Sequence, residues 1–247
     1  MSALSRTSGR TNVVPHPTIA LLRSASLSSA AQQEIERMIL DGEIAAGSKL
    51  TEAWLSERLG VSRGPIREAF RMLEEAGLVR QEKNRGVFVR EIPLEEALEI
   101  YDLRAAMDEL VGRRLAESIT PEQMKTMKGL VERLEAAARA GDADAYHLAN
   151  LQFHDTLVAF AGNRKLAGVY RRLVRELALF RRRNLVDETV LPHSAAEHRA
   201  ILKAIAAGNA EQAGRVMYDH VMESKERALQ GERARTQPLR ARAGRKG

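Results

Sequence analysis

Cysteine is absent from the 247 residues of this chain, which excludes disulfides, thiolate metal sites and cysteine nucleophiles. Aromatic residues make up only 4%, while Ala, Leu, Arg and Glu are abundant, a composition that favours helices over strands. No apolar run approaches the ~18 residues needed to span a bilayer, so no membrane partner is expected. The polar start of the chain lacks the apolar core of a secretory signal, which predicts a cytoplasmic protein.

Net charge is low outside one end of the chain. Of the total of +6, residues 1–92 carry +2, residues 93–230 carry −1 and residues 231–247 carry +5. Bulk charge therefore does not identify a nucleic-acid-binding domain. Residues 231–247 have no apolar periodicity and are predicted to be a basic disordered tail, and the Ser- and Arg-rich residues 1–26 are predicted to be a disordered extension.

The segment that follows shows the order helix, helix, turn, helix and hairpin. Capping residues predict three helix starts, at Ser29, Thr51 and Ser62. Two short β-prone runs, 78–81 and 87–90, then enclose a turn rich in Asn and Gly. This order is typical of a winged helix-turn-helix.

Long basic side chains occupy the positions that such a domain would turn towards DNA. Arginine near the start of a recognition helix can pair with guanine in the major groove, and the helix amides can hold a phosphate. A Gly beside an Arg at the hairpin tip allows close approach to the sugar-phosphate edge. The predicted DNA-contacting residues are Ser62, Arg63, Arg67, Arg71, Arg85 and Gly86. The alternative is a solvated helix face whose arginines pair with Glu68, Glu74 and Glu75, but the order of elements favours a DNA reader.

Pro93 ends the wing, and residues 93–230 are predicted to form an all-helical antiparallel bundle of about six helices. Two histidines of this bundle flank a turn at Gly208, His198 ten residues before it and His220 twelve after it. In an antiparallel hairpin both lie about 15 to 18 Å from the turn, so they should face each other.

A third histidine lies on the preceding long helix. Asn150 and His154 are four residues apart and share one helix face. Nitrogen and amide oxygen atoms from three helices can close around a divalent ion, which predicts a metal site of Asn150, His154, His198 and His220. The alternative is a set of core histidines without a metal. His147 lies about 10 Å along the helix from His154 and is predicted to stay outside the site, like His16 and His193.

The motifs of the first domain resemble the winged helix-turn-helix of the GntR family. They are GEIAAGSKL at 42–50, LGVSRGPIREAF at 59–70, GLV at 77–79 and RGVFV at 85–89. The resemblance implies that Ser62, Arg63, Arg67 and Gly86 meet DNA. The chain departs from the family at Gly64, where Thr or Ser is usual, and at Ala53, where some members have an Arg.

The bundle resembles the FCD effector domain of the FadR subfamily. The similar residues are IYDLRAAMD at 100–108, Phe153-His154, Gly162-Asn163, EHRAI at 197–201, Ala207-Gly208-Asn209 and His220. The resemblance implies three histidine ligands to Zn²⁺ or a similar ion such as Ni²⁺ or Mn²⁺, with Arg104 holding the carboxylate of an effector. Asn150 stands where metal-binding members have Asp, which implies a weaker or more positive site. The alternative role for Arg104 is a salt bridge to Asp108.

The sequence thus predicts a mainly α protein with a winged helix-turn-helix at 27–92 and an effector-binding and dimerisation domain at 93–230. The expected function is transcriptional regulation, as a repressor, by a homodimer on a pseudo-palindromic double-stranded DNA operator, controlled by a small carboxylic acid. Two alternatives stay open: a metal-dependent hydrolase or lyase, and an architectural DNA-binding dimer without a ligand. No general base stands out near the histidines, because Glu197, next to His198, should point off the metal face, and this argues against an enzyme.

Overall fold

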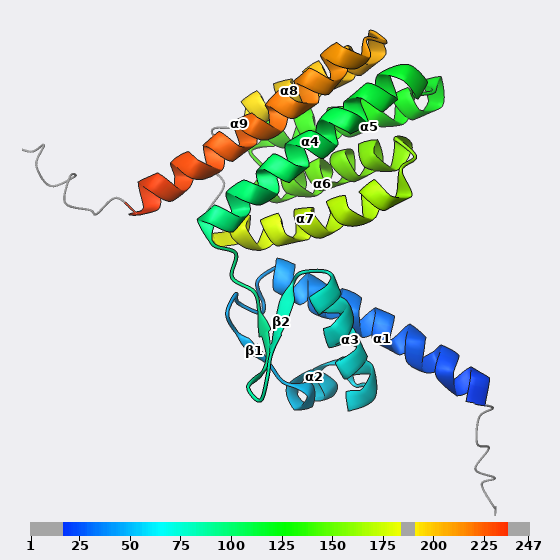
Figure 1. The fold of residues 1–247 in the computed structure, drawn as a ribbon, viewed down its shortest axis with the longest axis vertical. Coiled ribbons are helices and arrows are strands. Elements are labelled where there is room, and N and C mark those ends of the chain that lie inside the picture. The colour runs from blue at the N-terminus through cyan, green and yellow to red at the C-terminus, as the bar shows by residue number, and fades with distance from the viewer. Residues whose placement is uncertain (1–16, 184–190, 237–247) are drawn as a thin grey trace, which may run out of the picture.

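The structure, a computed structural model, describes residues 17–183 and 191–236. A small winged body and a larger helical bundle lie side by side, joined by the short segment 90–93 (Figure 1). The winged body contains α1 (Pro17–Leu40), β1 (Lys49–Leu50), α2 (Glu52–Leu59), α3 (Arg63–Glu75), β2 (Val79–Glu82) and β3 (Gly86–Val89). The bundle contains α4 (Leu94–Ser118), α5 (Pro121–Ala140), α6 (Ala143–Phe160), α7 (Arg164–Arg183), α8 (Leu191–Ala206) and α9 (Ala210–Thr236).

Local signals set the ends of the helices in the winged body. The hydroxyl of Thr51 accepts a hydrogen bond from the amide of Trp54 and begins α2, which ends at Gly60 in the left-handed conformation (φ 65°). Ser62 occupies the N-cap position of α3, as predicted, but its side chain makes no capping hydrogen bond. Its hydroxyl is therefore left for another partner.

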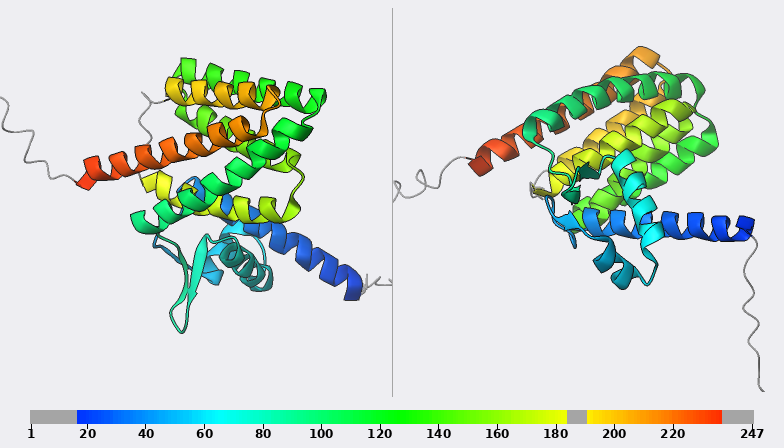
Figure 2. Two further views of the ribbon diagram at one scale, coloured as in Figure 1. Left: turned by 45° about the horizontal axis from the view of Figure 1, so that its top comes forward. Right: turned by 60° about the horizontal axis from the view of Figure 1, so that its bottom comes forward.

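The wing is a three-stranded antiparallel sheet in the order β1-β3-β2. The turn between β2 and β3 contains Asn84, whose φ of 61° suits the Asn predicted there. Strand β1 was not predicted, because Lys49 and Leu50 are too short a run to give a period; they pair with Phe88 and Val87 of β3. The hairpin projects away from the bundle (Figure 2).

Two predicted boundaries are wrong. Helix α1 begins at Pro17, so residues 17–26 of the predicted disordered extension are helical, and the capping box at Ser29 lies inside the helix. Proline is favourable at the first helical position, and the helix formers Ala20, Leu21 and Leu22 follow within the first two turns. At the other end, α9 continues to Thr236, because Glu232 and Arg235 pair along the helix. Residues 1–16 and 237–247 lie outside the described part of the chain.

Buried side chains form two hydrophobic clusters. One fills the bundle between α5, α6 and α8 and includes Leu134, Phe153 and Ile205. The other is continuous from the winged body, with Ile35 and Leu73, into the bundle. The two bodies therefore share a core. Among the described helices, none combines the length and apolarity that a membrane span requires.

Candidate functional site

Helix α3 divides into a buried face and an exposed arginine face. On one face, Ile66 and Leu73 are completely buried in the winged body. The side chains of Arg63, Arg67 and Arg71 are exposed on the other face, one turn apart. This is the arrangement that a recognition helix needs in the major groove.

The arginines are partly engaged by surface carboxylates. Arg67 Nε donates to Glu52 Oε1 at 2.8 Å, and Arg71 Nη1 lies 3.1 Å from Glu68 Oε2. Glu74, a predicted alternative partner, instead accepts a hydrogen bond from the amide of Gln81. Exposed ion pairs of this kind contribute little free energy, so a phosphate or base edge can replace them.

The tip of the wing is basic and contains a glycine with a positive φ angle. Arg85 pairs with Glu82 and lies over the ring of Phe88, with Cζ 5.6 Å from the ring centroid. Gly86 adopts a φ of 113°, and a Cβ there would meet Cε of Lys49 at 2.9 Å. The conformation favours glycine, whereas the end of the flexible Lys49 side chain can move aside.

The three bundle histidines converge, as their spacing predicted. His154 of α6 lies between the other two: its Nε2 is 3.3 Å from Nε2 of His198 on α8 and 3.3 Å from Nε2 of His220 on α9. All three side chains are buried, with exposed fractions of 6% or less. The ring of Phe153 packs edge-on against His198 and closes one side of the cluster.

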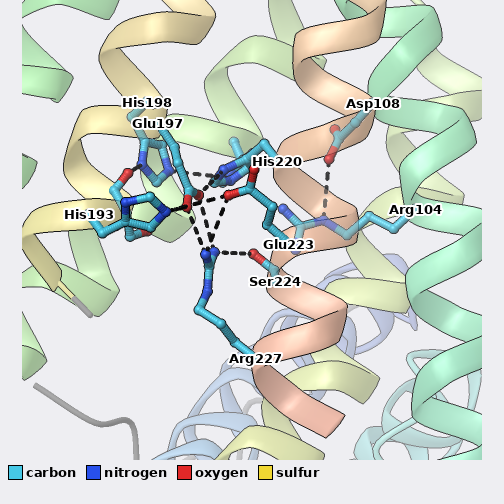
Figure 3. Close-up of polar contacts among 11 residues, drawn as sticks. Arg104, Asp108, His193, Glu197, His198, His220, Glu223, Ser224 and Arg227 are labelled. Carbon is cyan, nitrogen blue, oxygen red and sulfur yellow. Dashed lines mark hydrogen bonds and ion pairs between the residues drawn. The ribbon is translucent and has the colours of Figure 1, made fainter. Parts of the chain in front are cut away.

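Hydrogen bonds fix the tautomers of two of these rings. His198 Nδ1 donates to the carbonyl oxygen of Ser194 at 2.6 Å, and His220 Nδ1 donates to the carboxylate of Glu197 at 2.7 Å (Figure 3). Both rings therefore present bare Nε2 lone pairs to Nε2 of His154. Such converging lone pairs need a shared cation or proton.

The donor set fits a divalent metal ion. Two ligands of a tetrahedral site with metal–nitrogen bonds of about 2.0 to 2.1 Å lie about 3.3 to 3.4 Å apart, which agrees with the observed 3.3 Å. The buried Nδ1 of His154 has no hydrogen-bond partner among the described residues. The ring of His154 is therefore held in place by packing and by the contacts of its Nε2 atom.

The environment keeps the three imidazoles neutral. Burial, together with the nearby charge of Arg104, lowers the pKa of His154 well below its usual 6.5. Burial lowers the pKa of His198 to about 3, and burial also lowers that of His220 despite the opposing effect of Glu197. Neutral imidazole is the form that binds a metal.

Glu197 acts from outside the ligand set. The sequence placed it off the ligand face; the structure agrees, but its carboxylate holds the outer nitrogen of His220. Arg227 donates to both oxygens of Glu197, at 2.7 and 3.1 Å. Although burial opposes it, these hydrogen bonds hold the pKa of Glu197 well below its usual range. His193, 69% exposed, lies 3.1 Å from the same carboxylate.

Arg104 reaches the cluster from α4. Its Nε donates to the hydroxyl of Tyr170 at 3.0 Å and lies 3.4 Å from Asp108 Oδ2, so the predicted salt bridge is present. Burial raises the pKa of Asp108 to about 6 against the opposing charge of Arg104. Among the described residues, the hydrogen bond and the ion pair of Arg104 both use Nε, so its terminal nitrogens can serve a further acceptor beside the histidines (Figure 3).

The sequence also assigned positions relative to the cluster to Asn150, His147 and His16. Asn150 lies one turn before His154 on α6 and is half-buried; its role as a ligand stays a prediction. His147 is outside the cluster, and His16 lies outside the described residues. Sequence reasoning missed Tyr170 and Arg227, because contacts between residues 66 and 30 positions apart leave no periodic signal.

Comparison with known proteins assigns both bodies. Residues 27–89 match the bacterial regulatory proteins of the gntR family, and residues 99–223, half of the chain, match the FCD domain. The chain belongs to the GntR family. It is a transcription regulator, not an enzyme, with a DNA-binding winged helix-turn-helix and an FCD effector domain.

Several relatives are named regulators or repressors. The chain is 27% identical over 188 residues to the HTH-type regulator YdhC of Bacillus subtilis, covering 76% of this chain and 84% of YdhC. It is 28% identical over 200 residues to the probable D-xylose utilization operon repressor of Paenarthrobacter nicotinovorans, covering 81% and 88%. It is 31% identical over 137 residues to the gluconate operon repressor of Bacillus licheniformis, covering 56% of each.

Solved structures share the fold. McbR/YncC of E. coli superposes with a TM-score of 0.73 at 18% identity, over 83% of this chain and 97% of McbR. A GntR regulator from Rhodococcus sp. RHA1 superposes with a TM-score of 0.70 at 25% identity, over 83% and 98%. This GntR family regulator therefore has the two-body architecture of its relatives.

Proposed function

We propose that this GntR family regulator is a homodimeric repressor whose FCD domain holds a divalent metal ion, with zinc as the leading candidate. We propose further that this domain senses a small carboxylic acid. The observation that carries the metal is the convergence of three Nε2 atoms: those of His198 and His220 each lie 3.3 Å from that of His154, and hydrogen bonds at Nδ1 leave both as acceptors. His154, His198 and His220 would be the ligands, with Asn150 completing the set. When bound, the ion would act as a Lewis acid towards a carboxylate oxygen of the effector.

The environment of Arg104 supports the proposal that the effector is a carboxylate. A buried guanidinium whose Nε is occupied offers its two terminal nitrogens as a fork, which matches a carboxylate in bidentate geometry. Tyr170 and Asp108 hold the fork in place from behind. We expect the acid to be a small molecule, because the histidines and Arg104 lie within one buried cluster.

The operator would be read by Ser62, Arg63, Arg67 and Arg71 of α3, with Arg85 and Gly86 at the wing tip. Two such winged domains need two half-sites, which motivates a homodimer on a pseudo-palindrome. The relatives named as repressors support repression as the direction of control.

The test is elemental analysis of the tag-free protein beside His154→Ala, followed by melting curves with lactate, malate, citrate and gluconate. We expect about one divalent ion per chain, lost in the variant, and a melting point raised by some acids only in the metal-loaded form. Chelation should weaken the effector response more than DNA binding. A metal-free protein that ignores every acid would contradict the proposal and leave a DNA-binding dimer with inert histidines.

A further inference from the structure

Helix α7 lies on the side of the bundle that faces the winged body (Figures 1 and 2). We propose that Glu176 of α7 is a positioning residue for the DNA-binding domain, and that α7 transmits the state of the Arg104 site to it. The positioning role rests only on the membership of the chain in the GntR family, whereas the transmission along α7 rests on the function proposed above.

The carboxylate of Glu176 occupies a niche that a missing side chain creates. Gly77 directly follows recognition helix α3 and has a φ of +77°. A Cβ at this position would stand 2.1 Å from Glu176 Oε1, so the carboxylate fits only against glycine. The side chain of Glu176 is 6% exposed. The bundle therefore touches the end of the helix that reads DNA.

Two arginines hold this buried charge. Arg172, one turn earlier on α7, donates from Nε to Glu176 Oε1 at 2.9 Å. Arg90 comes from the segment that leaves the wing: its Nη1 lies 3.4 Å from the same oxygen and donates to the Gly77 carbonyl at 3.2 Å. The other terminal nitrogen of Arg90 pairs with Glu96 of α4. Removal of the Glu176 charge thus leaves Arg90 with no carboxylate on α7.

The surrounding contact is apolar and includes a second ion pair. Leu177 and Phe180 of α7 belong to the same hydrophobic cluster as Ile35 and Leu73 of the winged body. Beside Glu176, Arg175 Nε donates to Glu36 of α1 at 2.6 Å. Apolar packing is non-directional, whereas charged hydrogen bonds have a fixed geometry. Glu176 therefore sets the angle at which the two bodies meet.

The same helix contacts the effector site. The Tyr170 hydroxyl accepts from Arg104 Nε at 3.0 Å and donates to Asp108 Oδ2 at 3.3 Å. Tyr170 precedes Glu176 by six residues, about 9 Å along the helix axis. A carboxylate that draws Arg104 towards itself changes the hydrogen bonds of Tyr170. Because α7 is one continuous helix, a shift at Tyr170 displaces Glu176.

The only tryptophan, Trp54 on α2, allows a direct test of the positioning half. Its time-resolved fluorescence anisotropy reports whether the winged body tumbles with the bundle. We expect a single slow rotational component in the wild type, and an added component several-fold faster in Glu176→Gln, which keeps the size but loses the charge. The matched control is Asp155→Asn, which breaks the Asp155–Arg171 pair on the side of α7 facing α6 and should leave the decay unchanged.

A second variant guards against misfolding. Arg90→Gln removes the same contact from the winged side and should produce the same fast component. Both variants should also bind a duplex, selected from a random pool by the wild type, about tenfold more weakly. Wild-type anisotropy and wild-type DNA affinity in both variants would overturn the positioning role.

The coupling half is tested with the panel acid that raises the wild-type melting point most. We expect Glu176→Gln to bind this acid with wild-type affinity by calorimetry, while its DNA affinity no longer changes with acid. An undiminished DNA response in the variant would overturn the coupling. If the wild type binds none of the acids, the proposed function and the coupling fail together, and the anisotropy still decides the positioning role.

Discussion

At the scale of single residues, two sites carry the chemistry, the exposed arginine face of α3 and the buried histidine cluster, and they differ in how firmly their side chains are held. The arginines of α3 are exposed, and their ion pairs are easily exchanged. The histidines are buried, with Nδ1 of two rings fixed by Ser194 and Glu197. A surface that must adapt to DNA can be mobile, whereas a metal site needs preset ligands.

Arg63→Ala and Arg67→Ala should each reduce the free energy of specific DNA binding by about 1 to 3 kcal/mol, because each arginine can make a bidentate pair with guanine. Binding to a selected duplex and to a scrambled duplex, measured at one salt concentration, separates specific from bulk effects. Arg139→Ala on α5 removes the same charge from an exposed side chain of the bundle and serves as the control. Equal losses on both duplexes would contradict base reading.

Asn150→Asp should raise the metal affinity about tenfold, since a carboxylate adds a negative charge to a site that is otherwise neutral and close to Arg104. Competition titration with a chromogenic chelator measures the change. His147→Asn, on the same helix but outside the cluster, controls for altered helix stability. An unchanged affinity would show that residue 150 is not a ligand.

At the scale of elements, the position of His220 depends on how closely α4 and α9 pack. Gly112 of α4 lies directly against α9: a Cβ there would stand 2.6 Å from the carbonyl oxygen of Ala213. Gly214 faces α4 in the same way, where a Cβ would meet Arg113 at 2.8 Å. Two small residues thus bring His220 within reach of the α6 and α8 histidines.

Gly112→Ala should destabilise the protein by about 1 to 3 kcal/mol, because a backbone atom of α9 must move to admit the methyl group. Urea unfolding measures the free energy. The matched control is Gly129→Ala on α5, where no neighbouring side chain or other helix of the described residues lies within 4 Å of the added Cβ, and a small gain in stability is expected. Equal effects of the two substitutions would mean that helix propensity, not packing, decides.

At the scale of the whole molecule, the buried histidines make stability depend on pH. In the unfolded chain each titrates near 6.5, whereas burial lowers the pKa of all three in the folded state, that of His198 to about 3. The folded protein thus binds fewer protons, and its stability is lost as pH falls below the unfolded value. Asp108, whose pKa burial raises to about 6, acts in the opposite direction below that pH.

Without metal, the free energy of unfolding should therefore decrease between about pH 7 and pH 5, by up to about 1.4 kcal/mol per pH unit for each histidine. Urea unfolding in the presence of a chelator measures it. His154→Gln, which has no titrating group at this position, should show a shallower pH dependence. A stability that does not change over this range would contradict neutral buried imidazoles.

The sequence by itself determined the architecture and the ligand candidates. Capping residues, the Asn and Gly of the hairpin turn, and apolar periodicity are local signals, and they placed α2, α3 and the wing. The register of one antiparallel hairpin is nearly local too, which explains why His198 and His220 were expected to meet. The start of α1 at Pro17 and the end of α9 at Thr236 were misjudged, because the polar ends of the chain were assigned from their composition and not from the prolines at positions 17 and 238.

Only the tertiary structure decided what surrounds those residues. Tyr170 behind Arg104, Arg227 behind Glu197, and Glu176 against Gly77 join positions far apart in the chain. Such contacts arise where rigid helices pack, and packing geometry depends on all the side chains of an interface together. No periodic pattern in the sequence indicates this packing geometry. The sequence therefore names the groups that can bind, and the packing of α7 and α9 determines how they are held and connected.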